Sequence, residues 1–274
     1  MTLSRRDVSE LLTTHGLAPS RALGQNFVVD PNTVRRIAAL AEVGGGDNVI
    51  EIGAGLGSLT RALLETGANV VAIEVDRGLI PILRELEQEH APQLRVVEAD
   101  ALKANWDEIL GDTGNWKLIA NLPYNVATPL VADLLDTVPQ IESMLVMVQY
   151  EVGERFVAKP RSKAYGALSV KVAYWATAKI VGTVSAQVFL PRPKVASALV
   201  RVTRLPSPAV DADPKELFAL VRTAFGQRRK MLRRSLSGIV SDEAFAEAEI
   251  SPEARPEELD VLQWGKLCNA IHKN

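Results

Sequence analysis

The chain has 274 residues, of which 47% are hydrophobic and 23% charged, and its formal net charge is −2. This composition indicates a globular protein with a full core, longer than one typical domain, and it excludes disordered and collagen-like chains. No apolar run approaches the roughly 18 residues that cross a bilayer, and no secretory signal begins the sequence, so we expect a cytoplasmic protein. The lone Cys268 and three scattered histidines predict neither an internal disulfide nor a structural metal.

Strand and helix patterns alternate along the first part of the chain. A short apolar strand at 49–52 runs into a glycine-rich turn, and helical spacing follows it. This alternation continues downstream and predicts a parallel sheet with right-handed crossovers. The expected strands are 49–52, 69–73, 95–98, 117–120, 141–150 and 198–202, and the first two expected helices are 58–64 and 79–90.

The last quarter of the chain has a different pattern. A Pro-rich stretch at 205–208 indicates a linker, and four helical patterns follow it. We therefore predict two domains, an α/β domain over 1–205 and a small all-α domain over 206–274. The four expected helices are 214–225, 228–239, 242–248 and 261–271.

Positive charge is concentrated in the middle of the sequence. Residues 1–154 carry a net charge of −11, residues 155–234 carry +14 and residues 235–274 carry −5. Between Arg155 and Arg204 there are ten Lys and Arg side chains and no Asp or Glu. A single charge run is often just a solvated face, but a bias sustained over this length predicts a surface for a polyanion.

Polar signals fall at the predicted carboxyl ends of strands, where open parallel sheets bind ligands. Gly53, Gly55 and Gly57 follow the first strand, and glycines let a ligand lie against the backbone at the start of a helix. Glu74 ends the second strand about 20 residues further on, the separation at which a carboxylate reaches a ribose diol. Together these residues predict a nucleoside site. Their G-x-G-x-G spacing departs from the dinucleotide fingerprint, which makes NAD the weaker alternative.

The third and fourth strand ends add groups that can recognise a base. Asp100 can accept a hydrogen bond from the exocyclic amine of an adenine, or it can cap the next helix. Asn121, Leu122, Pro123 and Tyr124 bring an amide, a proline-fixed turn and an aromatic ring to one strand end. The Asn121 amide oxygen and the Leu122 carbonyl can accept the two hydrogens of an aromatic amine, while Tyr124 stacks on the ring. This segment predicts a site that makes an exocyclic amine nucleophilic.

Six motifs are specific in combination: LGQNF at 23–27, EIGAGLG at 51–57, EADAL at 98–102, NLPYN at 121–125, VFLPRPKV at 188–195 and RRKMLR at 228–233. They resemble the ribosomal RNA adenine N6-dimethyltransferase family, and its bacterial small-subunit (16S rRNA) branch in particular. The resemblance implies a Rossmann-like S-adenosylmethionine-dependent methyltransferase fold with a mostly parallel seven-stranded sheet. It also implies S-adenosyl-L-methionine as the cofactor, and the expected contacts are Asn26, Val28, Gly53, Gly55, Glu74, Asp100 and Asn121.

The resemblance further implies a reaction and a partner. The expected reaction is dimethylation of two adjacent adenosines in a hairpin loop near the 3′ end of 16S rRNA, within the immature small (30S) ribosomal subunit. A role in subunit biogenesis and a monomeric protein are also expected. The catalytic candidates are Asn121, Leu122, Pro123 and Tyr124, with Phe189 either on the other face of the flipped base or in the core. The expected RNA-binding residues are Arg192, Lys194, Arg222, Arg228, Arg229, Lys230, Arg233 and Arg234.

Two other functions are possible. The 23S rRNA adenine N6-methyltransferases of the macrolide-resistance type share the pocket motifs, but residues 228–236 resemble the small-subunit branch more closely. A non-catalytic ribosome assembly factor would keep only a vestige of the pocket. The intact set of Gly53, Glu74, Asp100 and Asn121 argues against that alternative.

Overall fold

The computed structural model describes residues 2–111, 114–123 and 126–271. The chain divides into two compact units, one formed by residues 1–153 and 179–203 and the other by residues 154–178 and 204–274. The predicted boundary between residues 205 and 206 lies close to the point after residue 203 where the chain leaves the first unit for the last time. The prediction was wrong in one respect, because it assigned the whole of 154–178 to the first domain.

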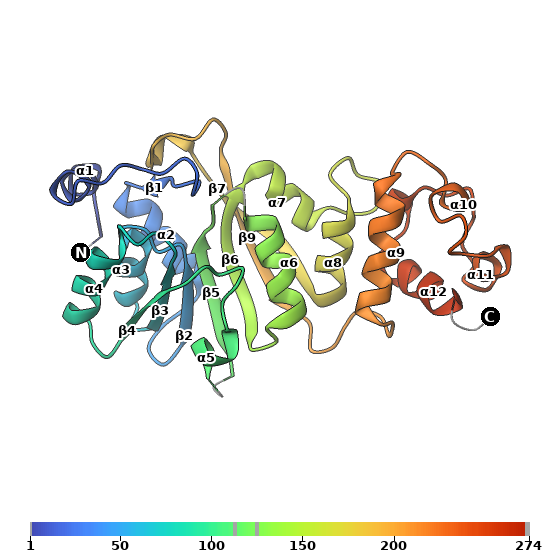
Figure 1. Cartoon of the computed structure of the whole chain (residues 1–274), viewed down its shortest axis with the longest axis horizontal. Coiled ribbons are helices and arrows are strands. Elements are labelled where there is room, and N and C mark those ends of the chain that lie inside the picture. The colour runs from blue at the N-terminus through green and yellow to red at the C-terminus, as the bar shows by residue number, and fades with distance from the viewer. Residues whose placement is uncertain (1, 112–113, 124–125, 272–274) are drawn as a thin grey trace. The chain divides into compact units, whose positions relative to one another are not determined.

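A seven-stranded sheet in the order β4-β3-β2-β5-β6-β9-β7 is the main feature of the first unit (Figure 1). The first five strands in this order, β4, β3, β2, β5 and β6, each pair in parallel with their neighbours, and β9 pairs antiparallel with β6. The structure thus confirms the predicted α/β fold with a mostly parallel sheet. The strands are β2 (Asn48–Ile52), β3 (Asn69–Glu74), β4 (Leu94–Glu98), β5 (Trp116–Asn121), β6 (Ile141–Gln149), β7 (Ala176–Val184) and β9 (Ser197–Arg204).

The strand order creates a crevice. From β2 the chain builds outward through β3 and β4, and it then returns to add β5 and β6 on the other side of β2. Loops at the carboxyl ends of β2 and β5 therefore diverge, and an open sheet binds its ligand where they separate. A second, two-stranded sheet pairs β1 (Phe27–Val28) with β8 (Phe189–Leu190) in antiparallel register.

Helices of the first unit begin where local sequence favours them. Ser4 and Asp7 form a reciprocal capping box, in which each side chain bonds the other residue's backbone N–H. Asp30 caps the next helix through the N–H of Thr33, and Pro31 occupies the first helical position. The helices are α1 (Arg5–Thr14), α2 (Pro31–Ala41), α3 (Ser58–Leu64), α4 (Ile80–Glu89), α5 (Trp106–Leu110) and α6 (Ala127–Thr137), and the chain passes from the first unit to the second within α7 (Tyr150–Val157).

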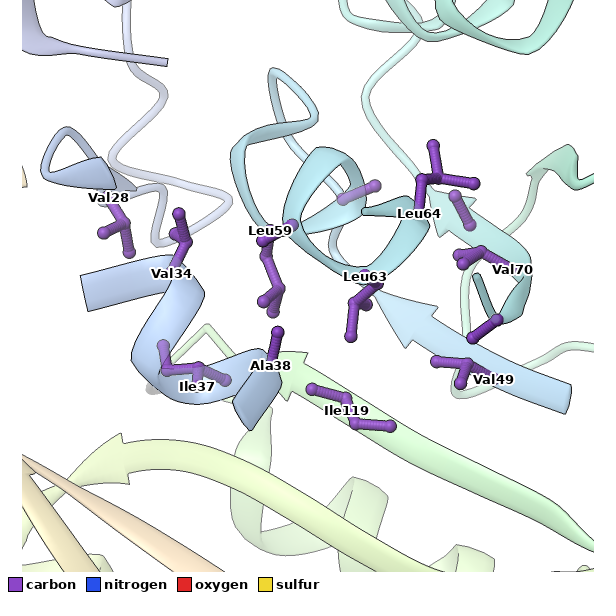
Figure 2. Close-up of a cluster of buried hydrophobic side chains, with 14 of the residues drawn as sticks. Val28, Val34, Ile37, Ala38, Val49, Leu59, Leu63, Leu64, Val70 and Ile119 are labelled. Atoms are coloured by element: carbon purple, nitrogen blue, oxygen red, sulfur yellow. The ribbon is translucent and has the colours of Figure 1, made fainter. Parts of the chain in front are cut away.

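A large hydrophobic cluster fixes α2 and α3 against the sheet (Figure 2). Leu63 of α3 is fully buried, and so is Val49 of β2. Truncation of such a leucine to alanine costs about 2–5 kcal/mol. This packing holds the loop between β2 and α3 in a fixed place. Labelled members of the cluster are Val28, Val34, Ile37, Ala38, Val49, Leu59, Leu63, Leu64, Val70 and Ile119.

The second unit has its own hydrophobic core, which explains the corrected boundary. Tyr174 belongs to this core, because its ring lies 5.2 Å from that of Phe218 and its hydroxyl donates to the carbonyl of Ala212. The Tyr165 hydroxyl likewise donates to the carbonyl of Leu259 at 2.7 Å. Residues 154–178 therefore fold with the C-terminal helices. The helices of this unit are α8 (Ala167–Trp175), which belongs to 154–178, and the C-terminal α9 (Pro214–Gly226), α10 (Leu232–Ser235), α11 (Asp242–Glu247) and α12 (Val261–Ile271).

One predicted helix is much shorter than expected. The pattern at 228–239 gives only the four residues of α10, because α9 ends at Gly226 and a turn follows in which the N–H of Lys230 donates to the carbonyl of Gln227. The strongly basic segment before α10 is therefore a turn. In the described part of the chain, no helix is both long enough and apolar enough to span a membrane.

Candidate functional site

A cavity of about 240 Å³ opens at the carboxyl ends of the central strands of the first unit. The loops after β2, β3, β4 and β5 all line it, together with the segment that leads into β1. The switch in strand order thus brings together the polar groups that the sequence placed at separate strand ends. The lining segments are 22–28, 51–56, 58–59, 73–75, 99–102, 121–123, Val126 and Leu130.

The glycine turn after β2 presents its backbone to the cavity. Gly53 and Gly55 have φ angles of +74° and +63°, a region that glycine adopts without strain. A Cβ atom on Gly55 would lie 3.2 Å from the ring of Phe27, so a side chain would also crowd the wall of the cavity. The N–H of Gly53 donates to the carbonyl of Ile73 at 2.8 Å and ties the turn to β3.

Glu74 is buried at the end of β3 with 5% of its surface exposed. Its Oε2 atom accepts the N–H of Gly55 at 2.8 Å, and its Oε1 atom accepts the N–H groups of Val75 and Asp76 at 2.9 Å each. Burial raises the pKa of this carboxyl, while the three N–H donors act in the opposite direction. The carboxylate therefore positions two loops of the cavity. Its expected bond to a ribose stays a prediction.

Asp100 follows β4 and is held by its own turn. Its Oδ1 atom accepts the N–H of Leu102 at 3.1 Å, and its Oδ2 atom lies 3.7 Å from the ammonium of Lys103. The side chain caps a turn, as in the alternative role that the sequence allowed, and it also lines the cavity. Val75 and Leu102 are among the exposed large hydrophobic residues and also line the cavity, where they offer apolar surface to a flat ring.

Asn121 is oriented by a segment almost 100 residues away in sequence. Its Nδ2 atom donates to the backbone carbonyl of Asn26 at 3.0 Å, and the Asn26 side chain donates to the carbonyl of Gly24, also at 3.0 Å. An amide whose nitrogen is fixed in this way keeps its oxygen as an acceptor. The segment before β1 therefore sets the direction of the strand-end amide. Val28, another expected contact, is buried in β1 and lines the cavity.

The turn after Asn121 leaves one carbonyl available. The Pro123 carbonyl accepts the N–H groups of Val126 and Ala127, both at 3.1 Å, at the start of α6. In the described residues, no donor reaches the Leu122 carbonyl, whereas the Leu122 N–H is fixed to the carbonyl of Met147. Leu122 is thus the backbone acceptor next to Asn121, and Pro123 shapes the turn. Tyr124, the expected stacking ring, lies outside the described residues.

Phe189 does not offer a face to a base in this structure. Its side chain is 1% exposed, belongs to the cluster around α2 and α3, and lies in β8 opposite Val28. It is also not part of the cavity wall. Of the two roles that the sequence allowed, the structure therefore supports the core role. Strand pairing with β1 is the physical reason, because it turns the ring inward.

Two polar residues that line the cavity, Glu51 and Ser58, were not predicted as site residues from the sequence. The Glu51 carboxyl, 1% exposed, accepts the Thr60 hydroxyl at 2.6 Å, and burial raises its pKa to about 8. Most Glu51 side chains are therefore protonated at neutral pH. The Ser58 hydroxyl is buried and has no hydrogen-bond partner in the described residues. Glu51 could have been found as the one charge inside an apolar strand, whereas Ser58 gave no clear signal.

The basic residues expected to bind RNA differ in their surroundings. Arg228 is bound to Glu257 at 2.6 Å and to the backbone carbonyls of Ser162 and Lys163, so it holds the second unit together. Arg233 lies 3.4 Å from Glu253. The other six are exposed, and no carboxylate partner for them is found in the described ranges. They are Arg192 and Lys194 in the first unit and Arg222, Arg229, Lys230 and Arg234 in the second.

Comparison with known proteins identifies the same family that the six sequence motifs resemble. The family model for ribosomal RNA adenine dimethylase matches residues 19–273. A relative from Leifsonia xyli subsp. xyli, named ribosomal RNA small subunit methyltransferase A, is 47% identical over 273 residues, which cover 96% of this chain and 95% of the relative. A relative of the same name from Bifidobacterium longum subsp. infantis is 44% identical over 286 residues, 98% of this chain and 93% of the relative.

Solved structures show the same fold. A dimethyladenosine transferase from Plasmodium falciparum superposes with a TM-score of 0.75 at 24% identity, over 89% of this chain and 96% of the other. The 23S rRNA methyltransferase ErmE superposes with a TM-score of 0.68 at 26% identity, over 90% of this chain and 99% of the other. The resemblance predicted from the motifs is therefore confirmed, and the chain is a methyltransferase that belongs to the ribosomal RNA adenine dimethylase family.

Proposed function

We propose that this protein uses S-adenosyl-L-methionine to dimethylate N6 of two adjacent adenosines in a hairpin loop near the 3′ end of 16S rRNA. Its substrate is the immature small (30S) ribosomal subunit in the cytoplasm, and it acts as a monomer that also contributes to subunit biogenesis. The observation that carries this proposal is the fixed amide of Asn121, whose nitrogen is held by Asn26 at 3.0 Å. Beside it lies the Leu122 carbonyl, which no donor of the described residues reaches.

The cavity residues fit the chemical parts of S-adenosylmethionine. Glu74 and Asp100 are acceptors for the ribose and the adenine amine, and the apolar side chains of Val75 and Leu102 suit the faces of the adenine ring. The amino-acid end needs polar partners as well. The buried Ser58 hydroxyl, which no group among the described residues bonds, is one candidate. The complete set that we propose to hold the cofactor is Asn26, Val28, Gly53, Gly55, Glu74, Asp100 and Asn121.

The bound cofactor supplies an electrophilic methyl group on a sulfonium, and the protein has to prepare the amine. The lone pair of adenine N6 is delocalised into the ring, so attack requires a more tetrahedral nitrogen. The Asn121 amide oxygen and the Leu122 carbonyl accept the two N–H groups and favour that geometry. Alignment at near-attack distance removes up to roughly 7–11 kcal/mol of the barrier in favourable cases.

No general base is needed before the transfer. The amine nitrogen becomes cationic and strongly acidic once it is methylated, so water can take its proton. The second methylation of the same nitrogen repeats the sequence with one N–H donor instead of two. In this mechanism Asn121 and Leu122 touch the reacting amine, Pro123 fixes the turn between them and helix α6, and Tyr124 stacks on the flipped base.

The free cations support an RNA substrate. Arg192, Lys194, Arg222, Arg229, Lys230 and Arg234 are exposed without carboxylate partners in the described residues, as expected for groups that contact phosphates. The fold of ErmE makes 23S rRNA the alternative substrate. The relatives at 44–47% identity are named for the small subunit, which favours 16S rRNA.

The test is mass-spectrometric mapping of methylated adenosines after the protein is incubated with S-adenosylmethionine and precursor ribosomal particles. We expect two neighbouring N6-dimethyladenosines in small-subunit rRNA and none in large-subunit rRNA. Methylation only of 23S rRNA would favour the alternative substrate. A protein that binds the particles but transfers no methyl group would act as an assembly factor, and our proposal would be rejected.

A further inference from the structure

Tyr150 is an exposed aromatic residue beside the proposed target site. It follows the last residue of β6 and begins α7, and 40% of its surface is exposed. Its backbone N–H donates to the carbonyl of Ala196 at 3.1 Å, which fixes the residue against the loop before β9. Val152 on the same helix is buried, so the inward face of α7 is packed without the Tyr150 ring.

The strand register places the backbone of Tyr150 relative to Asn121. Asn121 pairs with Met147, and Tyr150 follows Met147 by three residues, or roughly 10 Å along the strand at about 3.3 Å per residue. This separation joins backbone positions, so Tyr150 is offset along the strand from the residue that pairs with Asn121. From this offset position its ring can meet the nucleotide next to the adenosine in the RNA chain.

The neighbouring loop has the composition of a surface for single-stranded RNA. Val195, 44% exposed, adds apolar surface next to Ala196, and Arg192 and Lys194 add two exposed cations. Glu151, next to Tyr150, is acidic and exposed and would repel a phosphate. The loop that carries Arg192 and Lys194 is therefore the more favourable place for the phosphates. Exposed aromatic rings with nearby cations bind unpaired nucleotides by stacking and by phosphate contact.

We propose that Tyr150 stacks on the unpaired nucleotide adjacent to the adenosine in the active site. The inference rests on the proposed function, in which the two target adenosines are neighbours. While one base occupies the site, Tyr150 holds the other outside it. Tyr150 is thus a positioning residue that acts on the binding of RNA and makes no contact with the cofactor or the reacting amine.

Steady-state methylation of precursor small subunits tests this inference with four variants. We expect Tyr150→Ala to raise the KM for the particles about tenfold, in line with the strength of base–aromatic stacking, and to leave kcat and the Kd for S-adenosylmethionine unchanged. Tyr150→Phe and Tyr150→Trp should retain the parental KM. Tyr150→Leu should behave like Tyr150→Ala, because it fills space without offering an aromatic face.

Leu262→Ala is the matched control, since it removes an exposed apolar side chain, 51% exposed, from the second unit. Thermal melting checks that each variant is folded. The inference is overturned if Tyr150→Ala has the parental KM, or if leucine restores function as well as phenylalanine. Failure of the parent protein to methylate any particle would instead reject the proposed function itself.

Discussion

The cavity of the first unit and the basic turn of the second hold their polar groups in opposite ways. In the cavity, Glu74 and Asn121 are fixed by the backbone, at distances of 2.8–3.0 Å. In the turn after α9, Arg229 and Lys230 are exposed and meet no carboxylate within the described residues. Fixed, water-excluded dipoles act strongly one by one, whereas exposed cations act together and are weakened by salt. Single substitutions should therefore have large effects in the cavity and small effects on the surface.

Asn121→Ala should have the largest effect. It removes an acceptor aimed at the reacting amine, and loss of one such oriented group costs about 10²–10³ in rate. Single-turnover methyl transfer at saturating S-adenosylmethionine measures this directly. Asn69→Ala, at an exposed position at the start of β3, serves as the control. Near-normal transfer by a folded Asn121→Ala protein would mean that the amide does not hold the amine.

Glu51 gives a prediction that depends on pH. Its carboxyl has a folded pKa of about 8 because of burial, against an ordinary value of 4.5, so the folded protein keeps a proton that the unfolded chain releases between these pH values. The free energy of unfolding of the parent should fall across that window by roughly 1.4 kcal/mol per pH unit relative to Glu51→Gln. Below pH 4.5 and above pH 8 the difference should be constant.

Urea unfolding at about pH 5, 6.5 and 8 checks this prediction. Glutamine can still accept the hydroxyl of Thr60, which Glu51 accepts at 2.6 Å in the parent. Glu142→Gln, at an exposed position in β6, should track the parent at every pH. A constant difference between Glu51→Gln and the parent across the window would show that the buried carboxyl does not titrate there.

Glu74→Ala should weaken the binding of S-adenosylmethionine by about 1–3 kcal/mol, the usual cost of losing a charged hydrogen-bond partner. Titration calorimetry gives the Kd, and thermal melting separates this effect from the loss of the bonds to Gly55, Val75 and Asp76. Glu98→Ala is the control, because Glu98 ends β4 and pairs with Arg77 outside the cavity. Equal affinities for the two variants would remove Glu74 from the cofactor site.

Much of the fold could be predicted because its signals are local. The apolar strand before Gly53 and the strand that ends at Glu74 have clear periodicity, and parallel strands must bring their carboxyl ends to one edge. The bond between Asn121 and Asn26 could not be predicted, since it joins segments 95 residues apart. The burial of Phe189 likewise depends on the pairing of two two-residue strands, which have no periodicity to detect.

The second unit was harder to predict. Residues 154–178 carry the positive charge bias of the middle block, but their place is decided by tertiary packing of Tyr165 and Tyr174 with the C-terminal helices. Helical spacing at 228–239 was a poor guide, because Gly226 ends α9 and a turn follows before α10. Charge alone also did not separate the structural Arg228 from its exposed neighbours.

Substitution of the exposed basic residues, in contrast to the ion-paired Arg228, should have the smallest expected effect per residue on function. Arg229→Glu combined with Lys230→Glu should weaken binding to precursor small subunits and flatten its salt dependence, by about 0.7–0.9 log units per log unit of salt for each phosphate that the protein no longer neutralises. The affinity for S-adenosylmethionine should not change, because neither residue lines the cavity. Arg228→Glu is a contrasting variant that should lower thermal stability by breaking the ion pair with Glu257. A double variant with the parental salt slope would show that this turn is a solvated surface and that RNA binds elsewhere.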